Sequence, residues 1–150
     1  MAQKSAQVAW TDGVLLNYIG RRIDLDPCPM IVMFAKRESA KDFNDEKLVP
    51  MIEATPHLSA KIPITSKRDK NNRFDFKGFP GGFLKLVGSN SPSEVKSTPA
   101  PVVCVEEPDD CNTNVKEQGD TIALLIERTK SFARRKIITA GRRQLKILGC

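Results

Sequence analysis

Two short runs of consecutive apolar residues constrain the fold of this chain more than any other feature. Met30–Phe34 and Val102–Val105 are rich in β-branched side chains, and each run is bounded by turn-forming or acidic residues. A run without polar alternation is typical of a strand that is buried on both faces of a sheet. Such strands occur mainly in parallel sheets that helices cover on each side.

Segments with helical periodicity separate the apolar runs. The first helix is predicted to end near Gly20 and the basic pair Arg21 and Arg22, and Asp26 to Pro29 mark the turn that follows it. The patterns predict helices near 11–22, 39–52 and 121–132, a short capped helix after a turn at 88–93, and strands near 30–35, 83–88, 101–106 and 136–140. Alternating helices and strands predict a three-layer α/β fold with a mainly parallel central sheet.

Two segments have no regular pattern that we can interpret. Residues 63–77 are polar and charged, so we expect an exposed loop there. The last nine residues, 142–150, give no prediction of secondary structure. Neither segment contains a recognisable motif.

Composition limits the size of the fold and the kinds of partner. The chain has 150 residues, 40% of them hydrophobic, which fits one domain with a real core and is too short for two. Its formal net charge of +6 would attract polyanions such as DNA. The basic residues gather in two clusters, near 67–73 and 134–146.

Cysteine and histidine are too few and too widely spaced for a structural metal site. The four cysteines show no CxxC spacing, and His57 is the only histidine. No signal-peptide pattern opens the chain, and no apolar run is long enough to span a membrane. We therefore expect free thiols and a location in the cytoplasm.

The N-terminal segment can be set against the phosphate-binding loop GxxxxGK[ST], in which backbone amides cradle phosphate, a lysine neutralises it and a hydroxyl binds magnesium. Eight residues occupy that frame: Lys4, Ser5, Ala6, Gln7, Val8, Ala9, Trp10 and Thr11. Thr11 keeps the hydroxyl at the predicted start of a helix. The other key positions differ, so spacing alone favours an N-terminal strand that leads into a capped helix.

A pair of acids follows the apolar run Val102–Val105. Glu106 and Glu107 stand where the carboxyl end of a strand presents carboxylates to magnesium and water in P-loop enzymes. The alternative is a buried strand followed by a solvated acidic loop, since Asp109 and Asp110 continue the acidic run. The residues alone leave both interpretations open.

The order of the segments, however, resembles the large terminase subunit of lambda-type tailed phages over roughly residues 3–140. In that family the phosphate lysine stands at the start of the loop, which is the position of Lys4. Further matching segments are Ala40-Lys41-Asp42-Phe43, Phe79-Pro80-Gly81-Gly82-Phe83, Gly88-Ser89-Asn90-Ser91-Pro92, Glu106-Glu107, Gln118-Gly119-Asp120 and Glu127-Arg128-Thr129-Lys130-Ser131-Phe132. Several segments in one order are more specific than any single motif.

The resemblance implies a P-loop NTPase-like, truncated ATPase domain over residues 1–150, without the nuclease domain of the family. It implies binding of ATP by residues 4–11, of Mg²⁺ by Thr11 and Glu106, and activation of water by Glu107. The expected function is to power translocation of DNA into the procapsid. The expected partners are double-stranded DNA, the terminase small subunit, the portal protein and further copies of the chain in a ring.

Three departures from the family pattern support a second interpretation. Ala9 replaces a glycine, Glu106 replaces the usual aspartate, and residues 141–144 do not resemble the family's coupling segment. The alternative is a catalytically inactive prophage remnant, or an interaction module for DNA or protein, with the same fold. A helicase-type ATPase is a third possibility, but a standard loop lysine and the later helicase motifs are missing from the sequence.

Six other side chains have simpler interpretations that we prefer. His57 is expected in a polar surface turn, and Trp10 is expected to anchor the first helix in the core. Arg134 and Arg135 are expected to complement the end of a helix, although either suits the role of an arginine finger for the phosphate of a neighbouring subunit. Asp109 and Asp110 are expected to be solvated loop acids rather than part of a nuclease site.

Overall fold

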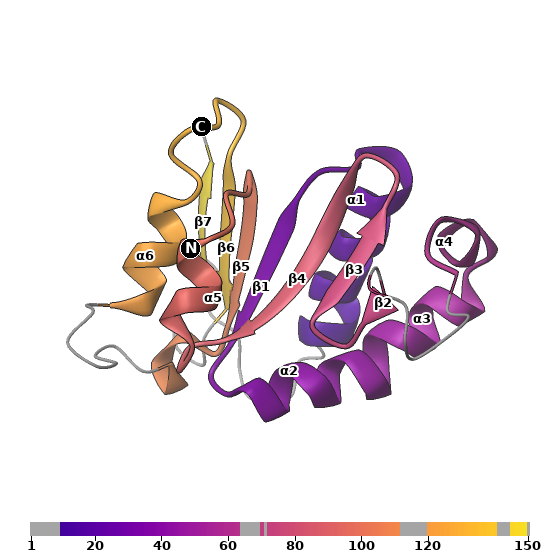
Figure 1. Cartoon of the computed structure of the whole chain (residues 1–150), viewed down its shortest axis with the longest axis horizontal. Helices are drawn as coiled ribbons and strands as arrows, with labels where there is room; N and C mark the ends of the chain where they lie inside the picture. The colour runs from indigo at the N-terminus through magenta and orange to yellow at the C-terminus, as the bar shows by residue number, and fades with distance from the viewer. Residues whose placement is uncertain (1–9, 64–69, 71, 112–119, 141–144, 150) are drawn as a thin grey trace.

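Four parallel strands form the centre of the molecule. They lie side by side in the order β4 (Gly82–Gly88), β1 (Met30–Phe34), β5 (Val102–Glu106) and β6 (Lys136–Ala140) (Figure 1). The computed structural model describes residues 10–63, 70, 72–111, 120–140 and 145–149. The four predicted strands are all present within a residue or two of their expected ends, and the prediction of a mainly parallel α/β sheet is confirmed.

Three antiparallel strands extend this sheet to seven strands in the order β2-β3-β4-β1-β5-β6-β7. On one side, β2 (Asn72–Arg73) pairs with β3 (Phe76–Phe79), which pairs with β4. On the other side, β7 (Leu145–Gly149) pairs with β6. The sequence analysis did not find β7 in the uninterpreted C-terminal segment.

The prediction of an irregular loop over residues 63–77 is wrong for its last part. Phe76 stacks on Phe83 of the neighbouring strand, with ring centroids 5.5 Å apart. On the opposite face of β3, Lys77 is buried, and its Nζ donates a hydrogen bond to the backbone carbonyl of Arg73. The charged composition predicted a loop, but Lys77 can be buried in a strand because its amine finds a backbone acceptor.

The central strand β1 is buried along its whole length, as its apolar run predicted. Ile31 and Met33 face one side of the sheet, and Met30, Val32 and Phe34 face the other. Burial of one such side chain contributes about 1.5–3 kcal/mol to the stability of the fold. The alternation explains why both faces of the sheet need a covering layer.

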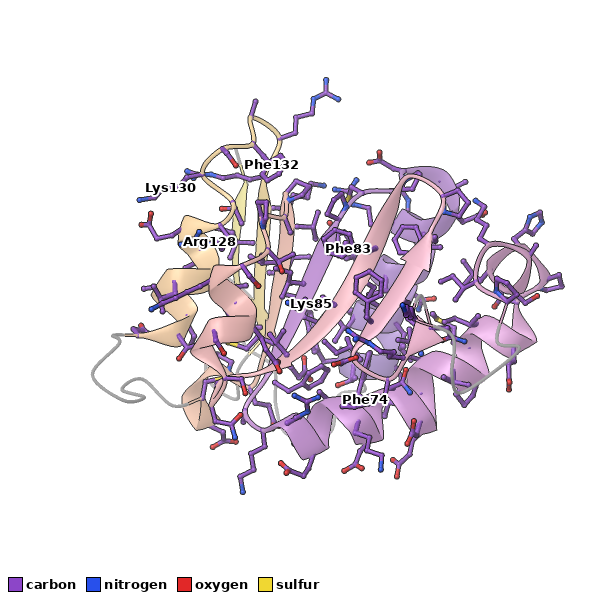
Figure 2. All side chains as sticks on the ribbon, in the orientation of Figure 1. Phe74, Phe83, Lys85, Arg128, Lys130 and Phe132 are labelled. Atoms are coloured by element: carbon purple, nitrogen blue, oxygen red, sulfur yellow. The ribbon has the colours of Figure 1, made fainter. Side chains whose placement is uncertain are left out.

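Two helical layers provide that cover, as Figure 1 shows. One layer is η1 (Thr11–Leu16), α1 (Asn17–Leu25), α2 (Arg37–Phe43), η2 (Asn44–Leu48), α3 (Val49–Ala54) and α4 (Pro56–Lys61). The other layer is α5 (Pro92–Lys96) and α6 (Thr121–Glu127), and the short turn η3 (Pro108–Asp110) follows β5. The cover on this second side reaches the end of β4, where Val87 is buried and Lys85 donates a hydrogen bond to the carbonyl of Glu94 in α5, whereas Phe83 at the start of β4 is only half-buried (Figure 2).

The first two predicted helices are present but longer than expected. The first runs from Thr11 to Leu25 and passes through Gly20 instead of ending there. Gly20 lies where α1 packs on α3 and α4, and a Cβ atom there would make ordinary van der Waals contacts, 3.5 Å from Leu58 and 3.6 Å from the sulfur of Met51. The second runs without a break from Arg37 to Ala54.

The last two predicted helices differ more from expectation. The helix α6 ends at Glu127 rather than at Phe132, and the Thr129 side chain donates a hydrogen bond of 2.7 Å to the carbonyl of Ile126 where the turns tighten. For α5, the predicted side-chain cap is wrong. Ser91 occupies the N-cap position without a side-chain cap hydrogen bond, and Pro92 opens the helix with its fixed φ.

Candidate active site

Thr11 and Glu106 meet although 95 positions separate them in the sequence. The Thr11 hydroxyl donates a hydrogen bond of 2.7 Å to Oε1 of Glu106. Glu106 ends β5, and Thr11 begins the first helix, so the contact lies at the carboxyl edge of the parallel strands. Open α/β sheets bind their ligands at this edge.

Local sequence explains why these two groups reach the edge. The four apolar residues of β5 are buried, and the first acid after them emerges half-buried at the end of the strand. On the facing helix, Leu15 and Leu16 are buried against the sheet, which fixes the start of the helix beside β5. The free N–H groups of a helix's first turn favour negative charge nearby.

The start of the first helix has a second attachment. Nζ of Lys47 in η2 lies 2.8 Å from Oδ1 of Asp12, so the second long helix holds the first turn in place. Both side chains are largely exposed, and an exposed pair of this kind contributes at most about 1 kcal/mol. The pair therefore orients the turn more than it stabilises the fold.

Glu107 follows in an uncommon backbone conformation. Its φ of 51° and ψ of 62° lie in the left-handed region, and no other non-glycine residue in the described ranges has a positive φ. Its side chain is half-buried. Non-glycine residues adopt this conformation at a cost and often at functional positions.

The donor set at this edge fits a magnesium ion. A hydroxyl oxygen and a carboxylate oxygen lie 2.7 Å apart, and both are ligands that this hard cation prefers. Glu106 is one methylene longer than the aspartate that the family resemblance implies, yet its carboxylate still reaches the Thr11 hydroxyl. The described residues contain no group of three or more histidine, cysteine or acidic side chains placed to hold a metal, so the pair of Thr11 and Glu106 stands alone as the candidate.

The structure leaves most of the predicted phosphate loop undescribed. Residues 4–9, from Lys4 to Ala9, lie outside the described ranges, so their part in a site stays a prediction. Trp10 is half-buried at the start of the first helix. Because Lys4 lies outside the described ranges, a pocket shared by Lys4, Thr11 and Glu107 stays a prediction.

Arg134 and Arg135 lie at the opposite edge of the sheet. They precede β6 and line a cavity of about 450 Å³ together with Arg22, Cys28 and Pro101. At about 3.3 Å per residue, the length of β5 separates this amino edge from Glu106 by about 13 Å. Neither arginine therefore serves the Thr11–Glu106 pair of its own chain.

The remaining side chains that the sequence analysis singled out are at the surface. His57 is exposed in the first turn of α4, so it stands in a short helix rather than in the predicted polar turn. Asp110 is exposed in η3 after Glu107. Both residues are at the surface as expected, although each stands in a helical turn rather than in the predicted turn or loop.

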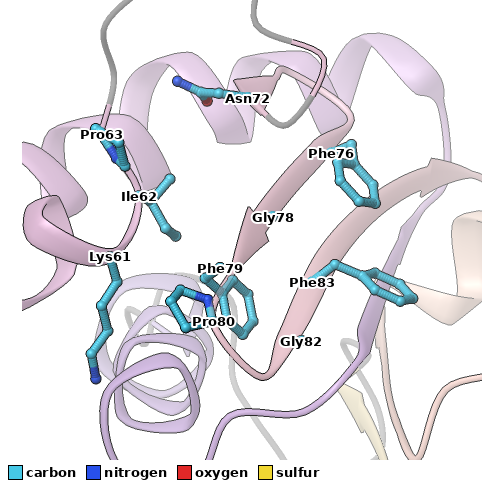
Figure 3. A pocket seen from close by; sticks show the side chains of 10 residues that line it. All are labelled: Lys61, Ile62, Pro63, Asn72, Phe76, Gly78, Phe79, Pro80, Gly82 and Phe83. Carbon is cyan, nitrogen blue, oxygen red and sulfur yellow. The ribbon is translucent and has the colours of Figure 1, made fainter.

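A cavity of about 480 Å³ opens where β3 turns into β4, away from the Thr11–Glu106 pair. Figure 3 shows the rings of Phe76, Phe79 and Phe83 and the turn at Pro80 along its wall. This turn precedes β4 and so belongs to the amino edge of the sheet. The cavity is therefore separate from the candidate active site.

Sequence reasoning missed three residues that support the acid turn. Ser89, Cys111 and Thr121 are all buried at the same carboxyl edge. Ser89 belongs to a turn directly after a buried strand, and this position is the one signal that could have pointed to it. The other two gave no sequence signal, because a single cysteine or threonine is usually a packing residue.

The fold and this edge define a three-layer α/β protein with its candidate ligand site at the carboxyl ends of parallel strands. The chain belongs to the family of the phage terminase large subunit gpA ATPase domain, whose family model matches residues 1–149. The match confirms the resemblance seen in the sequence and extends it past residue 140. A comparison with curated protein sequences gives no match.

The structure is also similar to the crystal structure of the HK97 bacteriophage large terminase. The TM-score is 0.71 at 15% sequence identity, and the similarity covers 95% of this chain. The chain corresponds to 28% of the length of that terminase chain. At this identity the likeness establishes the fold, and it agrees with a P-loop-like ATPase domain.

Proposed function

We propose that this chain binds and hydrolyses ATP as the motor domain of a terminase large subunit, and that hydrolysis powers the movement of double-stranded DNA into a procapsid. The observation that carries the proposal is the hydrogen bond between Thr11 and Glu106 at the carboxyl edge of the sheet. Membership of the ATPase-domain family supports nucleotide use. One domain over residues 1–150 fits the single sheet and its two layers.

Each residue has a stated role in the proposed reaction. Lys4 and the amides of residues 5–10 neutralise and hold the phosphates of ATP. Thr11 and Glu106 hold Mg²⁺, which supplies positive charge against the phosphate oxygens. Glu107 orients and polarises the water that attacks the γ-phosphate in line.

The proposed partners follow from charge and from the family. The net charge of +6 and the basic cluster at Arg134, Arg135 and Lys136 suit the phosphate backbone of DNA. The terminase small subunit, the portal protein and further copies of this chain complete the motor in the host cytoplasm. No helix in the described ranges is long and apolar enough to cross a membrane.

A second candidate function is an inactive remnant that keeps the fold and its binding surfaces. Glu106 and Ala9, which replace the family's aspartate and glycine, favour this candidate. Ala9 adds a Cβ to a backbone position where the family has none. The two candidates differ in one measurable property, which is magnesium-dependent turnover.

The test measures ATP binding and ATP hydrolysis by the purified chain with and without Mg²⁺. Glu107→Gln keeps the shape of the side chain and removes its negative charge, so we expect turnover to be lost while ATP binding is retained. Glu106→Asp and Ala9→Gly are expected to raise the rate. Absence of binding and hydrolysis in the parent chain and in the Ala9→Gly Glu106→Asp double variant would establish the remnant instead.

A further inference from the structure

The left-handed turn at Glu107 needs support from its surroundings. A non-glycine residue in a sparsely populated backbone region costs about 1–3 kcal/mol, and such a residue persists where neighbouring contacts hold it. Pro108 follows directly and restricts the backbone further. The position of the Glu107 carboxylate depends on this turn, because the turn sets the direction of its Cα–Cβ bond.

Cys111 holds this turn through two hydrogen bonds to its backbone carbonyls. Its Sγ donates a hydrogen bond of 3.6 Å to the carbonyl of Glu107, and its backbone N–H donates one of 3.2 Å to the carbonyl of Pro108. The side chain is 6% exposed. Burial raises the pKa of the Cys111 thiol to about 11, so at neutral pH the group keeps its proton and remains a donor.

Ser89 connects this thiol to two further strands. Its side chain lies beside the Cys111 sulfur. The Ser89 hydroxyl donates a hydrogen bond of 2.7 Å to the carbonyl of Ala35, and its backbone N–H donates one of 2.8 Å to the carbonyl of Phe34. The ends of β1 and β4 are thereby joined to the turn that follows β5.

Thr121 adds the start of α6 to the same network. Its hydroxyl donates a hydrogen bond of 3.0 Å to the carbonyl of Ser89, and both residues are fully buried. Buried polar networks with satisfied groups hold a single arrangement, because each group that loses its partner pays the cost of desolvation. The ends of β1, β4 and β5 and the start of α6 therefore meet at the turn that contains Glu107.

We infer that Cys111, supported by Ser89, is a positioning residue that holds the backbone of Glu107 in the conformation its proposed catalytic role requires. The inference rests on the proposed function. It assigns Cys111 a role that acts through Glu107 and not through contact with ATP. Loss of the thiol donor therefore lowers the rate of hydrolysis and leaves nucleotide binding intact.

The experiment compares three cysteine variants in the whole chain. Cys111→Ala removes the donor, and Cys111→Ser replaces the thiol with a hydroxyl donor. We expect Cys111→Ala to lower kcat about tenfold, which corresponds to about 1.4 kcal/mol of transition-state stabilisation, with KM for ATP within about twofold. Cys111→Ser should recover part of that loss.

Cys104→Ala is the matched control. Cys104 is an equally small, buried thiol in β5, and it packs in the core on the other face of the sheet. Its truncation leaves a similar cavity without removing a contact to the Glu107 turn. We expect a comparable loss of thermal stability and an unchanged kcat.

Three results would overturn the inference. They are an unchanged kcat in Cys111→Ala, equal losses of kcat in Cys111→Ala and Cys104→Ala, or a rise in KM that accounts for the whole effect. If Cys111→Ala does not fold, Ser89→Ala removes the second member of the network. This variant must then lower kcat and leave KM for ATP within about twofold. A parent chain that does not hydrolyse ATP overturns the proposed function together with this inference, whereas normal turnover in Cys111→Ala and Ser89→Ala overturns this inference alone.

Discussion

Gly82 lies against the backbone of Cys28 so closely that a Cβ atom at residue 82 would be 2.5 Å from the carbonyl carbon and oxygen of Cys28. The neighbouring Gly81 has a φ of +89°, and a Cβ there would be 2.9 Å from the ring of Pro27. The paired glycines therefore let the turn before β4 meet the turn before β1. This contact gives a structural reason for the two glycines in the segment Phe79–Phe83.

Gly82→Ala should destabilise the protein because a rigid backbone, not a flexible side chain, occupies the space. We expect the free energy of unfolding to fall by about 1–3 kcal/mol in urea titrations. Gly13→Ala is the matched control, since no atom of the described residues lies within 4 Å of a Cβ at that helical position. The control variant should raise the free energy of unfolding by up to about 1 kcal/mol, because alanine favours a helix more than glycine does. Equal stability of the two variants would show that the two turns are not in contact.

Thr11→Ala should weaken the use of magnesium, because it removes the hydroxyl that contacts Glu106. A hydrogen bond to a charged group contributes about 1.5–3 kcal/mol, so we expect the magnesium concentration for half-maximal hydrolysis to rise about 10- to 100-fold. Thr11→Ser keeps the hydroxyl and should stay near the parent value. A Thr11→Ala variant with an unchanged magnesium requirement would exclude Thr11 from the metal site.

Lys4→Ala should lower the affinity for ATP by removing the cation proposed to neutralise its phosphates. Direct binding measurements with a fluorescent ATP analogue separate this effect from turnover. Lys36→Ala removes one positive charge from an exposed position and provides the comparison. Equal affinity in both variants would remove Lys4 from the proposed phosphate loop.

Lys77→Met should change how stability depends on pH. Burial lowers the pKa of Lys77 below its ordinary value of 10.5, so the folded state releases this proton before the unfolded state does. The unfolded state then binds more protons just below pH 10.5, and the Lys77 contribution to stability rises with pH in that window. The free energy of unfolding of the methionine variant, minus that of the parent, should therefore decrease between neutral pH and about pH 10.

The comparison requires unfolding titrations of both proteins at several pH values, so that other titrating groups cancel. Lys70→Met removes a charge from an exposed position and controls for net charge alone. A constant difference between Lys77→Met and the parent at all pH values would contradict the assignment of a depressed pKa to Lys77.

DNA binding should depend steeply on salt, because backbone phosphates are its proposed target. Each phosphate contact contributes about 0.9 to the slope of log K against log salt concentration. The double variant Arg134→Ala Arg135→Ala should lower that slope by about 1–2 in binding titrations with duplexes of unrelated sequence. Arg21→Ala, on the exposed face of α1, should change it little.

If the Arg134 and Arg135 variants bind DNA normally, the remaining proposal for these residues is a neighbouring subunit. They lie at the edge of the sheet opposite to their own Glu106, so they can act on phosphate only across a subunit boundary. A mixture of Arg134→Ala Arg135→Ala with Glu107→Gln would then regain hydrolysis, because each variant supplies what its neighbour lacks.

Sequence alone determined the central part of this protein. The uninterrupted apolar runs at Met30–Phe34 and Val102–Val105 leave a chain of this size no alternative to burial on both faces, and burial on both faces requires helices in two layers. The order of its motifs was enough to recognise the family that the comparison confirms. The acid pair was identifiable because it ends a buried strand.

Tertiary structure decided everything that depends on contacts across long stretches of chain. Phe76 becomes part of a strand because Phe83 stacks on it, and the first helix continues through Gly20 because this part of the helix packs on Leu58 and Met51. Local pattern predicted the opposite in both places. Likewise, Cys111 has no sequence signal of function, and only the fold brings its thiol within hydrogen-bonding distance of the Glu107 carbonyl. Short-range propensity is weak compared with a single well-packed contact, so these positions take the conformation that the whole fold imposes.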